Sequence, residues 1–239
     1  MLVPRVNLND LKAYFRSPTR QTTAYAQNLA VRLFNFTNSA LSEDVVNIFW
    51  GLRNLSTILE AIHEGTDTPD TVLPSDIQFS DRVEVLERLV HKLWWVDKLA
   101  EPQHIIFRTF GWACLIYIYT KLRELPKELG LNAVLASRIR HALEASPVLN
   151  VLLATFQDLL LWQMFICGRV ADSRDRPFFA QQATKILMVR KLEDPADIVI
   201  AYEAFLWPER VRPTGTVAGT VITEEGDNME GKEASNIEH

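Results

Sequence analysis

The amino-acid sequence predicts an all-α domain of about eight helices followed by a disordered C-terminal tail. Prolines divide the chain into long segments, and a proline inside a helix costs about 3 kcal/mol because it removes a hydrogen bond and clashes with the preceding turn. Within these segments the apolar residues recur at helical spacing. From Arg212 onward Thr, Gly, Glu and Asn dominate, so too few large apolar residues remain to offset the entropy of the chain.

The segments between prolines give the expected helices and the parts of the chain. We expect an N-terminal extension at 1–20, a helical domain at 21–208 and an acidic tail at 209–239. The predicted helices span 22–37, 42–63, 81–99, 103–124, 131–144, 147–168, 177–191 and 195–207.

Two of these helices carry start signals with a physical mechanism. Ser146 can accept hydrogen bonds from free backbone N–H groups, and Pro147 supplies the φ of a first helical residue. Asp81 and Glu84 have the spacing of a reciprocal cap, which predicts that the helix at 81–99 begins there. The expected buried stripe of that helix is Val83, Leu86, Val90, Leu93 and Trp94.

The segments 104–120 and 147–168 are hydrophobic around most of the helix, which raises the question of membrane insertion. A spanning helix needs about 20 mostly apolar residues, and a charge near its centre costs several kcal/mol. Arg108 interrupts the first segment and Asp158 the second. We therefore expect two buried core helices and no membrane partner.

Composition argues against the common kinds of chemical site. The net charge of −5 and the pI near 5.6 disfavour direct contact with nucleic acid, because such contact depends on Lys and Arg displacing counterions. His63 and Glu64 begin like the zinc-protease motif, but Asp67 stands where the second His is needed. Two cysteines and five scattered histidines form no ligand set of zinc spacing. We predict no metal, no cofactor and no catalytic group.

Two charged residues stand inside strongly apolar predicted helices. A buried charge must find a partner or neutralise, so Arg108 and Asp158 are candidates for a buried polar pair. The alternative is that each lies on a narrow exposed stripe of its helix or near a helix end.

The stretch from Ser146 onward has a distinctive order of elements. An apolar helix carries Trp162 and ends at Gly168, and a charged loop, Arg174-Asp175-Arg176-Pro177, follows. Next come the aromatic pair Phe178 and Phe179 and two further helices, the last ending near Trp207. Over 146–208 this order resembles the C-terminal part of the fungal-specific transcription factor domain, the helical regulatory region downstream of a binuclear zinc-cluster DNA-binding domain.

The resemblance implies a nuclear, non-enzymatic regulatory domain at 21–208. It implies regulation in one of three ways: by holding partners of the transcription machinery or a second copy, by responding to a small-molecule effector, or by restraining an attached DNA-binding or activation segment. Trp162, Gly168, Phe178, Phe179 and Trp207 are then structural anchors between helices. A binuclear zinc cluster needs six cysteines, which this sequence lacks, so the chain is either part of a longer zinc-cluster protein or a standalone domain.

A second kind of function, other than regulation of transcription, stays open. An all-helical small-molecule-binding protein or enzyme could assemble its site from polar residues dispersed along the chain. Convergence of several ionisable side chains in one pocket would favour that reading over a purely regulatory module.

Overall fold

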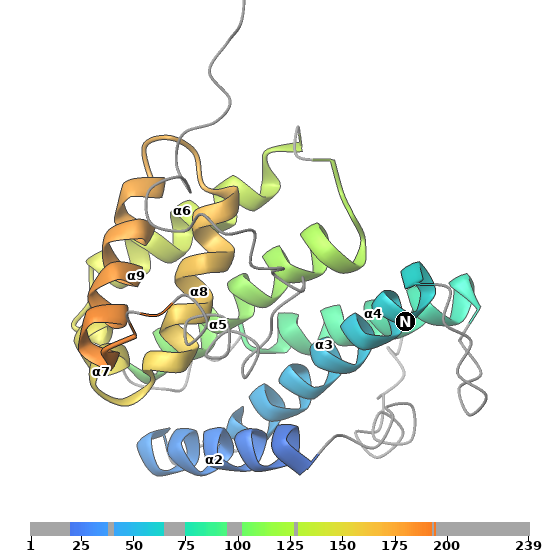
Figure 1. Cartoon of the computed structure of the whole chain (residues 1–239), viewed down its shortest axis with the longest axis horizontal. Coiled ribbons are helices and arrows are strands. Elements are labelled where there is room, and N and C mark those ends of the chain that lie inside the picture. The colour runs from blue at the N-terminus through green and yellow to red at the C-terminus, as the bar shows by residue number, and fades with distance from the viewer. Residues whose placement is uncertain are drawn as a thin grey trace, which may run out of the picture. The chain divides into compact units, whose positions relative to one another are not determined.

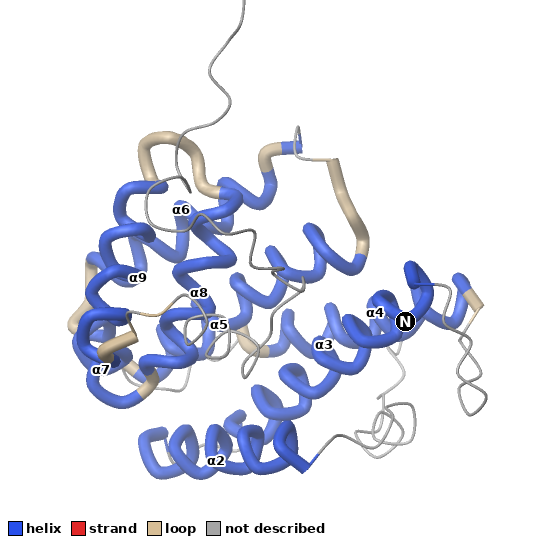
Figure 2. The backbone as a smooth tube through the Cα atoms, viewed as in Figure 1, coloured by secondary structure: helices blue, strands red, loops and turns tan. Residues whose placement is uncertain are grey.

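The chain folds into packed helices. The computed structural model describes residues 20–37, 41–64, 75–94, 102–126, 129–192 and 194, and all of them lie in the first of two units, Met1–Glu209 and Arg210–His239. Figure 2 shows helices and loops and no strand over these residues. The predicted all-α fold class is therefore confirmed for the part of the chain that the structure describes.

The described helices follow the expected segments closely. They are α2 (Arg20–Thr37), α3 (Leu41–Glu64), α4 (Asp76–Lys92), α5 (Gln103–Tyr117), the π-helical turn η1 (Ile118–Leu122), α6 (Leu131–Glu144), α7 (Val148–Thr155), α8 (Gln157–Val170) and α9 (Arg176–Arg190). The predicted extension, the predicted helix at 195–207 and the predicted tail fall outside the described residues, apart from Arg20 at the start of α2.

The helix α5 lies at the centre of the packing. It contacts α3 and α4 on one side and α6, α7 and α8 on the other, and α9 packs along α8 (Figure 1). Apart from Arg108 and Trp112, every α5 residue from Ile105 to Tyr117 is buried. A helix that is apolar on every face requires this position, because any exposed face would leave large side chains in water.

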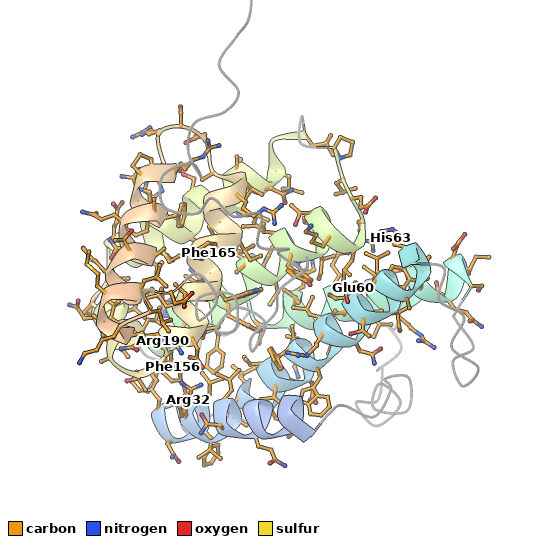
Figure 3. All side chains as sticks on the ribbon, viewed as in Figure 1. Arg32, Glu60, His63, Phe156, Phe165 and Arg190 are labelled. Atoms are coloured by element: carbon orange, nitrogen blue, oxygen red, sulfur yellow. The ribbon has the colours of Figure 1, made fainter. Side chains whose placement is uncertain are left out.

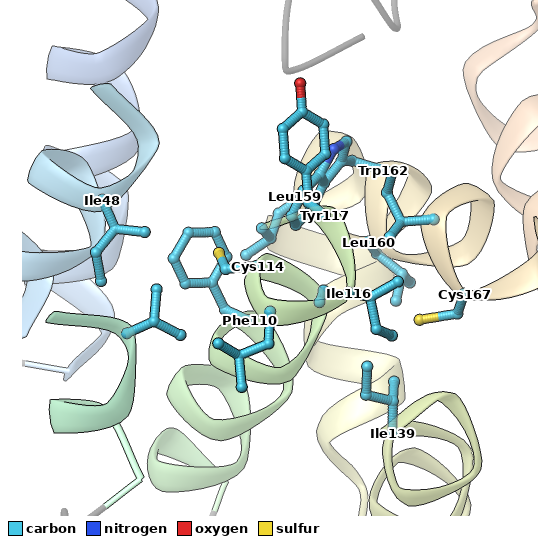
Figure 4. Packing of buried hydrophobic residues seen from close by; sticks show 14 of the residues in the cluster. Ile48, Phe110, Cys114, Ile116, Tyr117, Ile139, Leu159, Leu160, Trp162 and Cys167 are labelled. Carbon is cyan, nitrogen blue, oxygen red and sulfur yellow. The ribbon is translucent and has the colours of Figure 1, made fainter. Parts of the chain in front are cut away.

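A cluster of aromatic side chains joins α5 to α8. The ring of Trp162 on α8 lies 6.0 Å from that of Phe110 and 6.3 Å from that of Tyr117, both on α5. Figure 4 shows these rings beside Leu159 of α8. Rings at such distances contribute about 0.5–1.5 kcal/mol per pair beyond their buried area.

The helix α4 begins earlier than predicted. Its cap is Ser75, whose hydroxyl accepts the N–H of Gln78 at 3.3 Å while the Gln78 side chain accepts the N–H of Ser75 at 3.2 Å. The predicted cap at Asp81 and Glu84 is therefore wrong, because both residues lie inside the helix. The predicted stripe faces inward, with Val83, Leu86, Val90 and Leu93 buried and Trp94 partly buried.

The predicted helix at 147–168 is two helices. α7 and α8 meet at Phe156, whose backbone leaves the helical region (φ −129°, ψ 45°), and their axes bend by 118°. The Ser146 hydroxyl accepts the N–H of Val148 at 3.3 Å, as predicted, although the N-cap position of α7 is Pro147. The break gives α8 its own N-terminus, with Asp158 in the first turn.

The two apolar segments for which membrane insertion was in question lie in α5–η1 and in α7–α8. The continuous helix Gln103–Leu122 is long and apolar enough to cross a membrane, yet 72% of its most apolar stretch is buried inside the domain. The α7–α8 pair meets the same test only if its sharply bent helices count as one span. Burial among other helices is the behaviour expected of core helices.

Candidate functional site: a polar pocket beside the π-helical turn

The end of α5 departs from regular helical geometry. In η1 the N–H of Arg123 donates to the carbonyl of Ile118, five residues earlier, at 2.9 Å. Glu124 follows in the left-handed region with φ 46°, which is costly for a residue other than glycine. π-helical turns and strained residues are frequent at functional sites, so this end of α5 is a candidate functional site.

Contacts with α4 hold the turn in place. The hydroxyl of Tyr119 donates to a carboxylate oxygen of Glu87 at 2.6 Å, and the guanidinium of Arg123 pairs with the other oxygen at 3.0 Å. Burial raises the pKa of Tyr119, so its phenol stays protonated and can donate this hydrogen bond to Glu87. One acidic side chain of α4 thus fixes two residues of the irregular segment.

A pocket of about 220 Å³ opens between α3 and this turn. The α3 wall consists of Ser56, Leu59, Glu60 and His63. The opposite wall consists of Tyr117, Lys121, Leu122 and Glu124. Figure 3 shows Glu60 and His63 on α3, close to the end of α5.

A hydrogen-bond chain forms the buried side of the pocket. The Ser56 hydroxyl donates to the carbonyl of Leu52 at 2.8 Å, so in its 2.6 Å contact with Tyr117 it acts as the acceptor and the phenol donates. Burial raises the pKa of Tyr117 more than this hydrogen bond lowers it. The phenol is therefore a neutral donor whose oxygen keeps acceptor capacity toward the pocket.

The polar side chains of the two walls follow the same spacing. Ser56, Glu60 and His63 stand at i, i+4 and i+7 on α3, and Tyr117, Lys121 and Glu124 repeat these intervals. On the regular helix α3 these intervals place the three side chains on one face, whereas the π-helical turn Ile118–Leu122 changes the rotation per residue on the other wall. The polar stripe on α3 is a signal in the sequence that the sequence analysis missed.

The pocket brings side chains of both charges together. It offers two carboxylates, one ammonium group, an imidazole and two hydroxyls around the apolar side chains of Leu59 and Leu122. Among the described residues, no group of three or more His, Cys, Asp or Glu is placed to hold a metal ion.

The structure places the two charges predicted as a pair in different surroundings. Asp158 is held by Arg32 of α2, with Nη2 to Oδ2 at 2.7 Å and Nη1 to Oδ1 at 3.2 Å. Arg108 lies on α5 with its guanidinium 5.9 Å from the ring centre of Trp112. Arg32 thus takes the place predicted for Arg108, because the bend at Phe156 turns the start of α8 toward α2.

Arg32 also closes the break between α7 and α8. Its Nη1 donates to the carbonyl of Thr155 at 3.2 Å, and its guanidinium lies 5.8 Å from the ring centre of Phe156. The last carbonyls of a helix have no partner within that helix, so a long-range donor stabilises the end of α7. No sequence pattern links position 32 to position 158.

Comparison with known proteins identifies the family. The sequence profile of the fungal specific transcription factor domain matches residues 27–203. The chain belongs to this family. No curated protein and no solved structure matches it.

Most of the predicted anchors of this fungal specific transcription factor domain lie in or beside the α8–α9 interface. Trp162 and Phe179 are buried, and Phe178 is partly buried with its ring 5.3 Å from that of Phe179. A Cβ atom added at Gly168 would lie 3.5 Å from the Cβ of Phe179, an ordinary van der Waals distance, so Gly168 faces α9 but its lack of a side chain is not required for the packing of α9 on α8. Trp207 lies outside the described residues.

The charged loop of this fungal specific transcription factor domain is tied to α6. Arg140 of α6 binds the buried carboxylate of Asp175 at 2.8 Å and the carbonyl of Arg174 at 3.3 Å. Burial alone would raise the pKa of Asp175, but hydrogen bonds from Ser137 and Arg140 outweigh it and lower the pKa. The loop therefore connects α6 with α9 through a carboxylate that stays ionised.

Proposed function

We propose that this chain is a non-enzymatic regulatory and interaction domain of a zinc-cluster-type fungal transcription factor, acting in the nucleus. The observation that carries the proposal is the family match over residues 27–203, which supports a role in transcription regulation. The partners would be proteins of the transcription machinery or a second copy of the chain.

Two properties of the chain support the proposed absence of a zinc cluster within it. The sequence has two cysteines where a binuclear cluster needs six, and both thiols are buried in the core. Burial raises the pKa of Cys114 and of Cys167, which keeps them as neutral thiols rather than metal-binding thiolates. DNA contact would then belong to another segment or another protein.

A reporter experiment tests the regulatory role. The whole chain is fused to an unrelated DNA-binding and activation module in a fungal reporter strain, and we expect a severalfold change in reporter output. The matched control is the same fusion with Trp162→Asp and Leu159→Asp, which place charges in the core and should prevent folding. Equal output from the two fusions at equal abundance in the nucleus would contradict the proposed function.

A biochemical experiment tests the absence of DNA binding. Purified chain is expected to contain no stoichiometric zinc and to show no preference among DNA sequences at physiological salt, because it carries net charge −5. Tight, sequence-specific DNA binding by the chain alone would overturn this part of the proposal.

A further inference from the structure

The helix α9 lies on the outside of the described helices, with one side against α8 and the other side exposed (Figure 1). Its buried side consists of Phe179, Gln182, Ala183 and Ile186. On the exposed side stand two large apolar side chains, Met188, which is 72% exposed, and Val189, which is 62% exposed. Neighbouring apolar side chains in water indicate a surface that a partner can cover.

The exposed side of α9 and both of its ends are positively charged. The segment 174–191 contains five Lys or Arg residues and one acidic residue, a net charge of +4 in a chain whose net charge is −5. Four of these cations are exposed, namely Arg174, Arg176, Lys185 and Lys191. The acidic residue, Asp175, is buried and bound to Arg140 of α6. No carboxylate of this segment is therefore left at the surface to balance the exposed cations.

The cation and the apolar side chains in the second half of α9 are neighbours. Met188 follows Lys185 by three residues and Val189 follows it by four, and side chains at these intervals lie side by side on a helix, with Cβ atoms about 5–6 Å apart. Within the described part of the chain the Lys185 ammonium has no hydrogen bond or ion pair, so its charge is available to a partner. We name Lys185, Met188 and Val189, with Arg176 and Lys191 at the two ends of the helix, the α9 surface.

Charge and apolarity together determine which partner fits the α9 surface. Carboxylates on the partner would meet Lys185 and the cations at both ends of the helix, because opposite potentials favour association. Large apolar side chains on the partner would cover Met188 and Val189, and the unbranched, polarisable Met adapts its shape to different apolar groups. A segment with both features can lie along the 15 residues of α9, a length of about 22 Å.

Nucleic acid is also negatively charged, but it matches this surface less well. A duplex presents a continuous row of phosphates, and a chain with net charge −5 repels that row outside its basic patch. Phosphates also offer no apolar group to cover Met188 and Val189, which lie between Lys185 and Lys191. The observations therefore favour a protein partner.

From these observations we infer that the α9 surface docks an acidic segment of a partner protein, in which large apolar side chains stand between carboxylates. The partner carboxylates contact Arg176, Lys185 and Lys191, and the partner's apolar side chains pack on Met188 and Val189. The inference deepens the proposed regulatory function, and it rests on that function only where the partner is taken to belong to the transcription machinery.

Fluorescence anisotropy on the purified full chain tests the docking surface. The probe is a labelled synthetic peptide of about 15 residues, which as a helix has the length of α9, with Leu or Phe at every third or fourth position and Asp or Glu between them. We expect the peptide to bind saturably in the micromolar range. Raising the salt from about 0.1 M to about 1 M shortens the screening length from about 10 Å to about 3 Å and should weaken this binding about tenfold.

Two variants of α9 and one matched control locate the binding. Lys185→Glu reverses the central charge and should weaken binding of the peptide about tenfold or more. Met188→Gln combined with Val189→Gln removes the apolar surface and should weaken binding severalfold. The control combines Val134→Gln with Arg138→Glu, an exposed apolar side chain and an exposed cation four residues apart on α6, and should leave binding unchanged.

Two altered peptides separate the contributions of charge and apolarity. A peptide with Asn and Gln in place of Asp and Glu, and one with Ser in place of Leu and Phe, should each bind far more weakly than the acidic peptide. No saturable binding of the acidic peptide, full-strength binding of either altered peptide, or unchanged binding by both folded α9 variants would overturn the inference. Circular dichroism verifies that the variants fold.

A labelled DNA duplex tests the competing class of ligand. We expect it to bind the full chain more weakly than the acidic peptide. Tighter binding of the duplex that Lys185→Glu abolishes would overturn the inference, because the α9 surface would then recognise nucleic acid.

The reporter fusion separates this inference from the proposed function. If the wild-type fusion alters reporter output and the purified chain binds the acidic peptide through α9, both stand. Peptide binding without any reporter effect of the chain supports the docking surface and contradicts the regulatory role, and a reporter effect without peptide binding does the reverse.

Discussion

Replacing Arg32 by Met removes the link between α2 and the start of α8 while keeping an unbranched side chain that packs well in a helix. The change abolishes the two-pronged pair with Asp158 and the bond to the carbonyl of Thr155. Both lost interactions lie at the break between α7 and α8 at Phe156. We expect the native state to be destabilised and the fold to be kept.

The expected loss of stability follows from the partial burial of the pair between Arg32 and Asp158. The side chain of Arg32 is 27% exposed and that of Asp158 is 18% exposed, so the pair lies between the surface and the interior. Exposed pairs contribute about 0–1 kcal/mol, whereas breaking a buried pair costs about 3–5 kcal/mol. We therefore expect Arg32→Met to lower the free energy of unfolding by about 2 kcal/mol, which is roughly 4–8 °C in Tm for a domain of this size.

Urea denaturation followed by circular dichroism measures the effect, and a double-mutant cycle with Asp158→Leu isolates the pair. The control is Arg88→Met, whose partner Glu84 forms an exposed pair one turn away on α4 and whose loss should cost under about 0.5 kcal/mol. A coupling energy near zero between positions 32 and 158, or an equal loss in the Arg88 control, would refute the reasoning.

Three further predictions concern the packing, capping and charge of other elements. Gly111→Val should cost about 1–3 kcal/mol in unfolding free energy, because even a Cβ there would lie 3.1 Å from Nε1 of Trp94; unchanged stability would argue against the close contact. Ser75→Ala should cost about 1 kcal/mol through the lost cap of α4, whereas Ser75→Asp should retain most of the stability. The pKa of Asp175 is lowered in the folded state, so its ionised form stabilises the fold above its ordinary pKa of 3.8, and this stabilisation is lost as the pH falls through the folded-state pKa. The difference in unfolding free energy between wild type and Asp175→Asn should therefore shrink on acidification. A constant difference would exclude the ion pair with Arg140 as the source of the stabilisation.

Local signals predicted most helices and misplaced one start. The sequence around α4 offers two capping boxes, Ser75 with Gln78 and Asp81 with Glu84, and both satisfy the spacing rule. The structure uses the first, because it lets Phe79 join the packed face of the helix and leaves Glu84 free to pair with Arg88. Choosing between two valid caps requires knowledge of what the added turn packs against.

The break at Phe156 was beyond local reasoning for a different reason. No proline or glycine stands between Pro147 and Asp158, so the sequence predicts one continuous helix. The bend exists because tertiary contacts compensate for it, including the ring of Phe36, which meets that of Phe156 edge-on at 5.8 Å. Arg32 comes from a distant segment, and for this reason Asp158 was predicted as a charge in need of a partner and assigned the wrong one.

The candidate pocket illustrates a third kind of difficulty. Its walls come from α3 and from the end of α5, and only their tertiary packing brings the polar side chains of the two walls together. The π-helical turn makes the pocket harder to predict, because helical periodicity read from the sequence assumes a constant rotation per residue. Family resemblance predicted the kind of domain correctly from 146–208, yet it carried no information about this pocket.

The contact between Arg32 and Asp158 also has a consequence for the order of events during synthesis. The two residues are 126 positions apart, so at 5–20 residues per second the ribosome delivers Asp158 roughly 6–25 s after Arg32. During that interval α2 has no access to its carboxylate partner, and closing so long a loop slows the final docking step. The apolar side of α2 can pack against α3 once both helices have emerged, whereas the guanidinium of Arg32 is expected to stay in water until the start of α8 is available.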